Sequence, residues 1–360
     1  MKRNSNLDSY NKPIYKLLKD PISLISIIVI GIFLFLSIGA YLISPDKTPY
    51  ANEQHLEISV KKPGFSVEML CFKNLNQSKK NFFERLIYGQ PSEYIATPIF
   101  KHWKQGDKLF VETYTGDTPN NGEIICVNPE TDYKIEKRTY YLGTDRYGRC
   151  LLSQLIVGTR VSIAVGLISL IISLFIGITL GALAGYFGGW IDNVIMWLIN
   201  VVWSIPTVLL VVAITFALGK GFWQVFIAIG LTMWVDIARM VRGQVKSIKE
   251  KEYITASKAL GFSNRRIIIK HILPNIVGPI TVISASNFAS AILQEAGLSF
   301  LGLGVQPPMP SWGSIIKENY GYIILDAAYM AIAPGIAIML LVLSFFTLGS
   351  GIRKVIDIRN

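Results

Sequence analysis

Six of the stretches that contain no Asp, Glu, Lys or Arg are candidates for membrane-spanning helices. They are Pro21–Pro45, Val161–Ile191, Asn193–Gly219, Gly221–Val235, Ile272–Gln294 and Ala327–Ile352. A helix needs about 20 apolar residues to cross a bilayer core of roughly 30 Å, and all stretches but the fourth are longer than that. The fourth reaches this length only if Asp236 and Arg239 belong to the same helix at the membrane's edge. Because the stretches lack the alternation of barrel strands, they predict six membrane-spanning helices.

The first stretch follows basic residues, as the core of a signal peptide does. It is 25 residues long, however, against about 7–15 for a signal core, and no clear small-residue cleavage site follows it. We therefore expect a retained anchor, with transmembrane helix 1 at residues 22–44 after an N-terminal segment at residues 1–21.

Composition supports a membrane protein. Hydrophobic residues make up 51% of the chain and charged residues only 16%, whereas a soluble domain carries about a quarter charged residues. This excludes a disordered chain, a small disulfide scaffold and an ordinary soluble enzyme.

The formal net charge of +11 is concentrated on particular segments. Residues 241–275 hold eight cations against two acids, whereas residues 46–154 hold 15 basic and 14 acidic residues. By the positive-inside rule, residues 241–275 and both termini, including residues 351–360, are cytoplasmic. The net charge is thus mainly an orientation signal, so we expect a lipid bilayer and no nucleic acid as a partner.

Residues 45–154 are too many for a simple loop, and they carry the pattern of a small α+β insertion outside the membrane. Lys108–Thr115 and Glu123–Val127 are rich in β-forming residues, and the turn residues Gly116–Gly122 lie between them. This pattern predicts a β-hairpin. A short helix is expected upstream, with one side formed by Phe82, Phe83, Leu86, Ile87 and Tyr88.

The three cysteines, Cys71, Cys126 and Cys150, all lie between residues 45 and 154, with Cys150 near the end of this range. An extracytoplasmic location permits a disulfide, so a Cys71–Cys126 bridge and free thiols both stay open. The thiols together with His55 and His102 show no known metal-ligand spacing, so we expect no metal site.

Catalytic motifs are absent from the sequence. The only Gly-Lys pair, Gly219-Lys220, lacks the phosphate cradle of a nucleotide-binding loop. There is no Gly-x-Ser-x-Gly and no His-Glu-x-x-His, and the three histidines are scattered. We therefore expect that the chain is not an enzyme.

The cytoplasmic segment around residues 250–275 predicts a helix, a turn and a second helix. Gly261 is suited to end the first helix, Ser263 to cap the second and Pro274 to end or kink it. A basic loop that touches only lipid headgroups explains the same charges, so the residues alone leave both interpretations open.

The stretch Thr255-Ala256-Ser257-x-x-x-Gly261, which leads to Leu273-Pro274, resembles the Glu-Ala-Ala loop of ABC importer permeases. In that family the loop forms a coupling helix that docks into a groove on a separate ATPase. Here Thr255 stands in place of Glu and Ser257 in place of Ala. The resemblance implies these ATPase-coupling residues: Glu252, Tyr253, Thr255, Ala256, Ser257, Gly261, Leu273 and Pro274.

Three further stretches resemble the dipeptide, oligopeptide and nickel permeases of this family, and in particular the second, C-type permease. They begin at Leu142-Gly143-Thr144-Asp145, at Glu295-Ala296-Gly297-Leu298 and at Pro307-Pro308. Pro334-Gly335 and the closing Gly351-Ile352-Arg353 are similar to the last helix. The chain departs from the family at Cys150 and Ser350, where acidic residues are usual. The resemblance covers residues 142–357, and the insertion at 46–140 is longer than the group leads us to expect.

The resemblance implies an all-α polytopic membrane protein of the type I ABC importer permease fold, with six transmembrane helices and the α+β insertion between helices 1 and 2. Residues 155–350 form the permease core. The implied partners are a second homologous permease, two ATP-binding subunits and an extracytoplasmic substrate-binding protein. The chain itself binds no cofactor, since ATP and Mg belong to the ATPase.

Peptide import by alternating access, in the cytoplasmic (inner) membrane, is the function this implies. The same scaffold importing nickel or a metal chelate is an alternative. A secondary transporter or channel without an ATPase predicts inverted repeats and several acids within the helices, which are not visible in the sequence. An extracytoplasmic sensor on a membrane anchor leaves five helices unexplained.

Several glycine, proline and charged residues within the expected helices predict helix packing, a kink or a place in the transport pathway. Gly177, Gly181 and Gly185 repeat at a spacing of four, which predicts a helix-packing face, and Pro206 predicts a kink in the third helix. Glu295, together with Ser299, is assigned to the pathway, either as a gate or subunit contact or as a substrate contact. Asp236 and Arg239, three residues apart, are expected to pair with each other.

Overall fold

The computed structural model describes residues 13–74, 80–116, 118, 121–128, 132–219 and 221–357. The cations of residues 1–12, Arg359 and the turn residues Asp117, Pro119 and Asn120 lie outside the described residues. Two compact units make up the chain. The helical unit comprises residues 1–33, 162–305 and 338–360, and the mixed unit comprises residues 34–161 and 306–337.

Within the described residues, five helices are long and apolar enough to cross a membrane, and the count rises to six if one bent pair forms a single span. The helices of the chain that carry these spans are α3 (Pro21–Ile38), α6 (Leu151–Phe187), α7 (Gly189–Ser204), α8 (Thr207–Leu218), α9 (Phe222–Lys249), α12 (Val277–Phe300) and α14 (Tyr329–Asp357). A short helix, α2 (Pro13–Lys19), precedes α3. The chain is thus mostly helical, with several strongly apolar helices.

The bent pair is α7 and α8, which meet at an angle of 95° around Ile205 and Pro206. Proline cannot donate the helical hydrogen bond, and Ile205 before it adopts an extended conformation. The expected fourth stretch, by contrast, is the unbroken 28-residue helix α9. The interrupted helix is therefore the third stretch. The fourth stretch has few charge-free residues, but its helix, α9, is long because it continues through charged residues.

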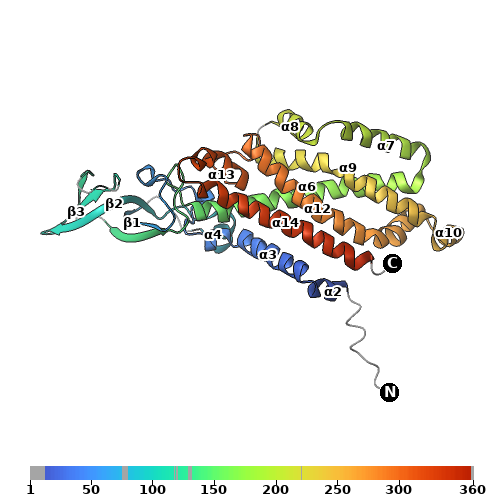
Figure 1. The fold of residues 1–360 in the computed structure, drawn as a ribbon, viewed down its shortest axis with the longest axis horizontal. Coiled ribbons are helices and arrows are strands. Elements are labelled where there is room, and N and C mark those ends of the chain that lie inside the picture. The colour runs from blue at the N-terminus through green and yellow to red at the C-terminus, as the bar shows by residue number, and fades with distance from the viewer. Residues whose placement is uncertain are drawn as a thin grey trace, which may run out of the picture. The chain divides into compact units, whose positions relative to one another are not determined.

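The core of the helical unit is built around α9. In its most apolar 18-residue window 67% of the residues are buried, the highest share among the candidate spans. Figure 1 shows α7 and α8 along one side of α9, and α6 and α12 along the other. A bidentate ion pair fastens the beginning of α7 to α9, because Arg242 Nη2 donates to Asp192 Oδ2 at 2.7 Å.

The mixed unit contains a five-stranded antiparallel sheet in the order β4-β3-β2-β1-β5 (Figure 1). Its strands are β1 (Phe65–Lys73), β2 (Tyr94–Gln105), β3 (Lys108–Thr113), β4 (Ile124–Val127) and β5 (Tyr133–Tyr140). The expected hairpin is confirmed, since β3 pairs with β4 with Leu109 opposite Val127. The other three strands were not predicted.

Short helices complete the mixed unit. They are α4 (Ala40–Ile43), α5 (Phe82–Tyr88) and α13 (Trp312–Asn319), with single 3-10 turns at Pro49–Ala51, Leu56–Ile58 and Tyr320–Ile323. The short helix expected over residues 82–88 is α5, and Asn81 and Glu84 form a capping box at its start. Its aromatic residues Phe82, Phe83 and Tyr88 are exposed.

All three cysteines are free, so of the two alternatives left open the structure has the free thiols and not the Cys71–Cys126 bridge. Cys71 lies in β1 and Cys126 in β4, and the strands β2 and β3 separate them in the sheet. Neighbouring strands are about 4.8 Å apart, so the two cysteines are separated by roughly 14 Å, about twice the Cα distance that a disulfide spans.

Candidate functional site

The segment that the resemblance assigns to ATPase coupling, residues 250–276, is called the coupling segment, and it begins where α9 ends. Glu250 follows Lys249 as the C-cap, and α10 (Glu252–Ala259) starts two residues later. Gly261 then takes a φ of 77°, and its N–H donates to the Lys258 carbonyl at 2.9 Å. This left-handed conformation favours glycine and gives the chain a sharp turn.

The second arm of the segment runs directly into a membrane-spanning helix. The Ser263 side chain accepts from the Arg266 N–H at 3.4 Å and caps α11 (Asn264–Arg266). A π-helical turn (Ile267–Ile272) and a 3-10 turn (Leu273–Ile276) follow, and α12 continues without a break. Pro274 does not end this helix, because the irregular turns accommodate the hydrogen bond that proline cannot make.

The two faces of α10 have different surroundings. Ile254 has no exposed surface and packs in a core cluster with Val245 and Ile267. Ser257 is also buried, and its hydroxyl donates to the Tyr253 carbonyl at 2.7 Å. This arrangement holds α10 rigidly against the helical unit.

The exposed side of the coupling segment carries most of the residues that the resemblance assigned. Glu252, Tyr253, Thr255, Ala256, Gly261 and Pro274 are exposed, whereas Leu273 is half-buried. Leu260 was not assigned, yet it is 74% exposed beside the turn. A large apolar side chain on a basic loop is suited to a protein contact, and this feature was visible in the sequence.

The three glycines at a spacing of four form the contact face between α6 and α9. A Cβ on Gly181 would lie 2.5 Å from the Ala238 carbonyl oxygen. A Cβ on Gly177 would lie 2.7 Å from Ile237, and one on Gly185 would lie 2.7 Å from the Arg242 carbonyl oxygen. The backbones of these helices therefore approach closely, as small residues permit in membranes.

Glu295 lies in α12 with no exposed surface. The Ser299 hydroxyl donates to Glu295 Oε1 at 2.6 Å, and the Val305 N–H donates to the Ser299 hydroxyl at 3.2 Å. The two residues thus stabilise the turn that follows α12. A gate or subunit contact and a substrate contact both stay predictions for Glu295.

Asp236 and Arg239 do not form the expected pair. The Arg239 guanidinium lies 3.8 Å from the centre of the Trp203 ring. Asp236 is exposed and lines a cavity of about 120 Å³ beside the break between α7 and α8. Arg239 makes a cation–π contact with Trp203 instead of an ion pair with Asp236. The three-residue spacing between Asp236 and Arg239 therefore did not determine the partner of Arg239.

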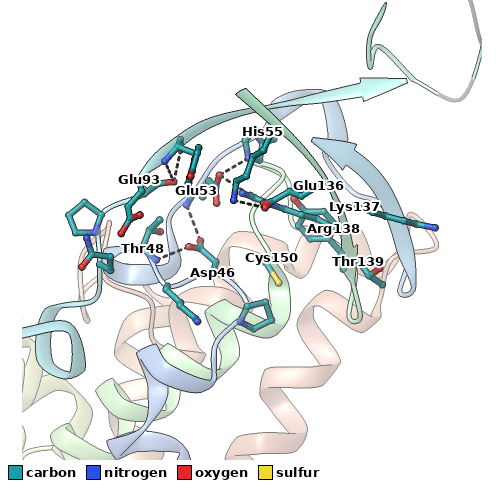
Figure 2. Close-up of a pocket in the computed structure, with 18 of the residues that line it drawn as sticks. Asp46, Thr48, Glu53, His55, Glu93, Glu136, Lys137, Arg138, Thr139 and Cys150 are labelled. Carbon is teal, nitrogen blue, oxygen red and sulfur yellow. Dashed lines mark hydrogen bonds and ion pairs between the residues drawn. The ribbon is translucent and has the colours of Figure 1, made fainter. Parts of the chain in front are cut away.

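A second cavity, of about 660 Å³, lies in the mixed unit. Figure 2 shows that Arg138 reaches it from β5 and meets Glu53 and Glu136. Arg138 Nη1 donates to Glu53 Oε1 at 2.9 Å and Nε donates to Glu136 Oε1 at 2.7 Å. His55 Nε2 lies 3.3 Å from the same Glu53 oxygen. Lys134 Nζ lies 2.8 Å from Glu136 Oε2, so Arg138 and Lys134 together balance the two carboxylates, which indicates a structural network.

The two glutamates titrate below their usual range. Burial alone would raise the pKa of Glu53, but the hydrogen bonds of His55 and Arg138 outweigh burial and lower it. The pKa of Glu136 is lowered in the same way, by Lys134 and Arg138 against burial. Both groups therefore stabilise the fold above the pKa of an unfolded Glu, about 4.3, and this contribution is lost as the pH falls through their folded values.

Replacing Arg138 by methionine should destabilise the mixed unit by about 2 kcal/mol at neutral pH, because two half-buried carboxylates lose their cation. The loss relative to the wild type should shrink below about pH 4, as the pH falls through the lowered pKa values of the two glutamates. Thermal unfolding of the purified chain at several pH values measures this. Lys137→Met, on the exposed neighbour in β5, is the matched control, and a loss that does not depend on pH would contradict the assignment.

The stretch Gly143–Arg149 ties three parts of the mixed unit together. Gly143 and Gly148 have φ values of 75° and 72°, and a Cβ on Gly148 would collide with the His55 carbonyl. Arg149 is buried and its Nε donates to Asp145 Oδ2 at 2.6 Å, while its Nη2 donates to Glu318. The stretch that resembles the family's entry to helix 2 thus has a structural role, because it holds residues near His55 and Glu318 together.

The family described as "Binding-protein-dependent transport system inner membrane component" matches residues 177–359. This match covers just over half of the chain and includes the coupling segment and its two adjoining helices. The chain belongs to this family. It is therefore an inner-membrane, multi-pass permease of an ABC importer and not an enzyme in itself, and such a permease implies ATPase and substrate-binding partners.

Relatives place the permease in the dipeptide and oligopeptide group. It is 39% identical over 230 residues to the dipeptide transport system permease protein DppC of Alkalihalophilus pseudofirmus, covering 64% of this chain and 75% of that one. It is also 39% identical over 218 residues to the glutathione transport system permease protein GsiD of Pectobacterium atrosepticum, covering 61% and 72%.

Among solved structures, the permease matches a chain of the MetNI methionine ABC transporter in an inward-facing conformation. The TM-score is 0.46 at 22% identity, and the match covers 56% of this chain and 96% of that chain.

Proposed function

We propose that this permease forms half of the pathway through which di- or oligopeptides, or peptide-like compounds, enter the cell. The relatives described above are named for a dipeptide and for glutathione, which is itself a small peptide, and this similarity is the observation that carries the proposal. Nickel has no comparable support.

The proposed assembly contains this permease, a second homologous permease, two ATP-binding subunits and an extracytoplasmic substrate-binding protein. The coupling segment transmits ATP-driven closure of the ATPases to α9 and α12, which adjoin it directly. ATP and Mg stay on the ATPase, so this chain holds no cofactor. Alternating access then moves the cargo without any chemical step on this chain.

The proposed topology has six spans, with α7 and α8 together forming the third and both termini in the cytoplasm. Residues 45–154, which include the five-stranded sheet, are then extracytoplasmic. We propose that this insertion contacts the binding protein or the partner permease and does not touch the cargo. The near balance of 15 basic and 14 acidic residues over 46–154 supports the outside location.

The native cysteines provide a test of this topology. A thiol reagent that cannot cross membranes should label the permease in intact cells or spheroplasts at Cys126, which is exposed. Cys71 should stay unlabelled, because burial raises the pKa of its thiol to about 11, and Cys150 is also buried. Cys126→Ser should abolish the signal. Labelling only after the membrane is permeabilised would overturn the topology.

Transport itself is tested with the complete complex in proteoliposomes. Uptake of a radiolabelled dipeptide should require ATP and the binding protein, and excess unlabelled dipeptide should abolish it. Uptake of nickel under the same conditions should stay at the level without ATP. ATP-dependent nickel uptake without peptide uptake would replace the proposed cargo.

A further inference from the structure

The break between α7 and α8 leaves a cavity within the helical unit. Because the two helices are bent by 95°, they do not cover one continuous face of α9. The cavity of about 120 Å³ lies there, and α12 forms its remaining wall. Asp236 and Asn287, which line it, lie near the middle of α9 and α12, both of which belong to candidate membrane spans.

Asp236 gives this cavity a negative charge. It is the only residue with a formal charge among the described residues that line the cavity. No ion pair or hydrogen bond joins its carboxylate to another described residue, since Arg239 stacks on Trp203 instead. A carboxylate in a candidate membrane span is costly unless it faces water or a cation, so such residues mark functional sites.

The neutral polar groups of the cavity add hydrogen-bond acceptors to this charge. Asn287 is 6% exposed, and its Nδ2 donates to the Met233 carbonyl at 3.3 Å, which fixes the orientation of the amide. Its Oδ1 has no partner within the described chain. Of the two acceptors, Gln294 Oε1 is the buried one, and it too has no hydrogen bond within the described residues. A buried acceptor without a donor costs free energy that a ligand can recover.

We propose that Asp236, Asn287 and Gln294 form an intramembrane subsite for the N-terminal ammonium group of the transported peptide. A primary ammonium carries a positive charge and three N–H donors, which match one carboxylate and two amide oxygens. A carboxylate or phosphate would meet acceptors and a like charge. The cavity has the volume of about four water molecules, so it accommodates the amino end and not the whole peptide.

This inference rests on the proposed peptide transport, and the experiment separates the two. Radiolabelled alanyl-photoleucine and its N-acetylated form are photo-crosslinked to the detergent-solubilised complex without the binding protein, so that delivery plays no part. The free-amine probe should label the wild-type permease about tenfold more than the acetylated probe, as expected for loss of a charged hydrogen-bonded contact. Asp236→Asn should remove this preference, and Asp236→Glu should restore it.

Glu250→Gln is the matched control, since Glu250 is an exposed acid at the end of the same helix and does not line the cavity. It should keep the full preference for the free amine. Equal labelling by both probes in the wild type, or an unchanged preference in Asp236→Asn, would overturn the subsite. Loss of the partner permease from purified Asp236→Asn would also overturn it, by showing a subunit contact. Absence of ATP-dependent peptide uptake by the wild-type complex would instead refute the proposed cargo.

Discussion

Gly261→Pro should abolish peptide uptake while the permease still reaches the membrane. Proline cannot adopt the φ of 77° found at Gly261, and it removes the N–H that donates to the Lys258 carbonyl. The conformational cost is about 3 kcal/mol, or a factor of about 100 in the population of the native turn. We expect retention of the ATPase on the tagged permease to fall by a similar factor, which co-purification measures.

A second substitution tests the contact surface without altering the turn. Leu260 is 74% exposed beside Gly261, so an aspartate there should leave the fold intact and prevent docking. Leu260→Met keeps an apolar side chain of similar volume and should retain the ATPase. Normal ATPase retention by both Gly261→Pro and Leu260→Asp would refute the assignment of this segment to coupling.

Gly181→Leu should prevent stable folding of the helical unit. The Cβ alone would lie 2.5 Å from the backbone oxygen of Ala238 and 2.9 Å from Val241, and neither helix can move aside without losing its other contacts. Overpacking of this kind costs about 3 kcal/mol or more. The expected result is a large fall in the thermal stability of the purified permease and in the yield of monodisperse protein.

Gly243→Leu is the matched control for this prediction. Gly243 lies on α9, and a Cβ there meets no atom within 4 Å. A substitution away from packed features should change stability by less than about 0.5 kcal/mol. Equal losses in Gly181→Leu and Gly243→Leu would show that the loss of stability does not depend on the close contact between α6 and α9, which contradicts the prediction.

Patterns that depend on neighbouring residues were readable from the sequence. The turn residues between two β-rich runs predicted the hairpin of β3 and β4, and Pro206 indicated where the third stretch is interrupted. Gly261 and Ser263 predicted the coupling turn in the same way, because a left-handed turn and a helix cap are set by one residue each.

Features that depend on distant partners were not readable. The strand β1 lies between β2 and β5 and is buried on both sides at Met69, Leu70 and Cys71, so it lacks the alternation that identifies a half-exposed strand. The length of α9 was also underestimated from charge-free residues. Its charges are accommodated within the fold, since Arg242 pairs with Asp192 and Arg239 stacks on Trp203.

The coupling segment has a mechanical consequence. It joins two long helices directly, because α9 enters it and α12 leaves it with no flexible linker. Asp236 lies on α9 about 20 Å before the coupling segment, at 1.5 Å per residue, and Asn287 lies on α12. We therefore expect a displacement of the coupling segment to move α9 and α12 together, and with them both walls of the cavity. The π-helical turn (Ile267–Ile272) and the 3-10 turn (Leu273–Ile276) are the irregular sections between the coupling segment and α12, so we expect any lag of α12 behind α9 to arise there.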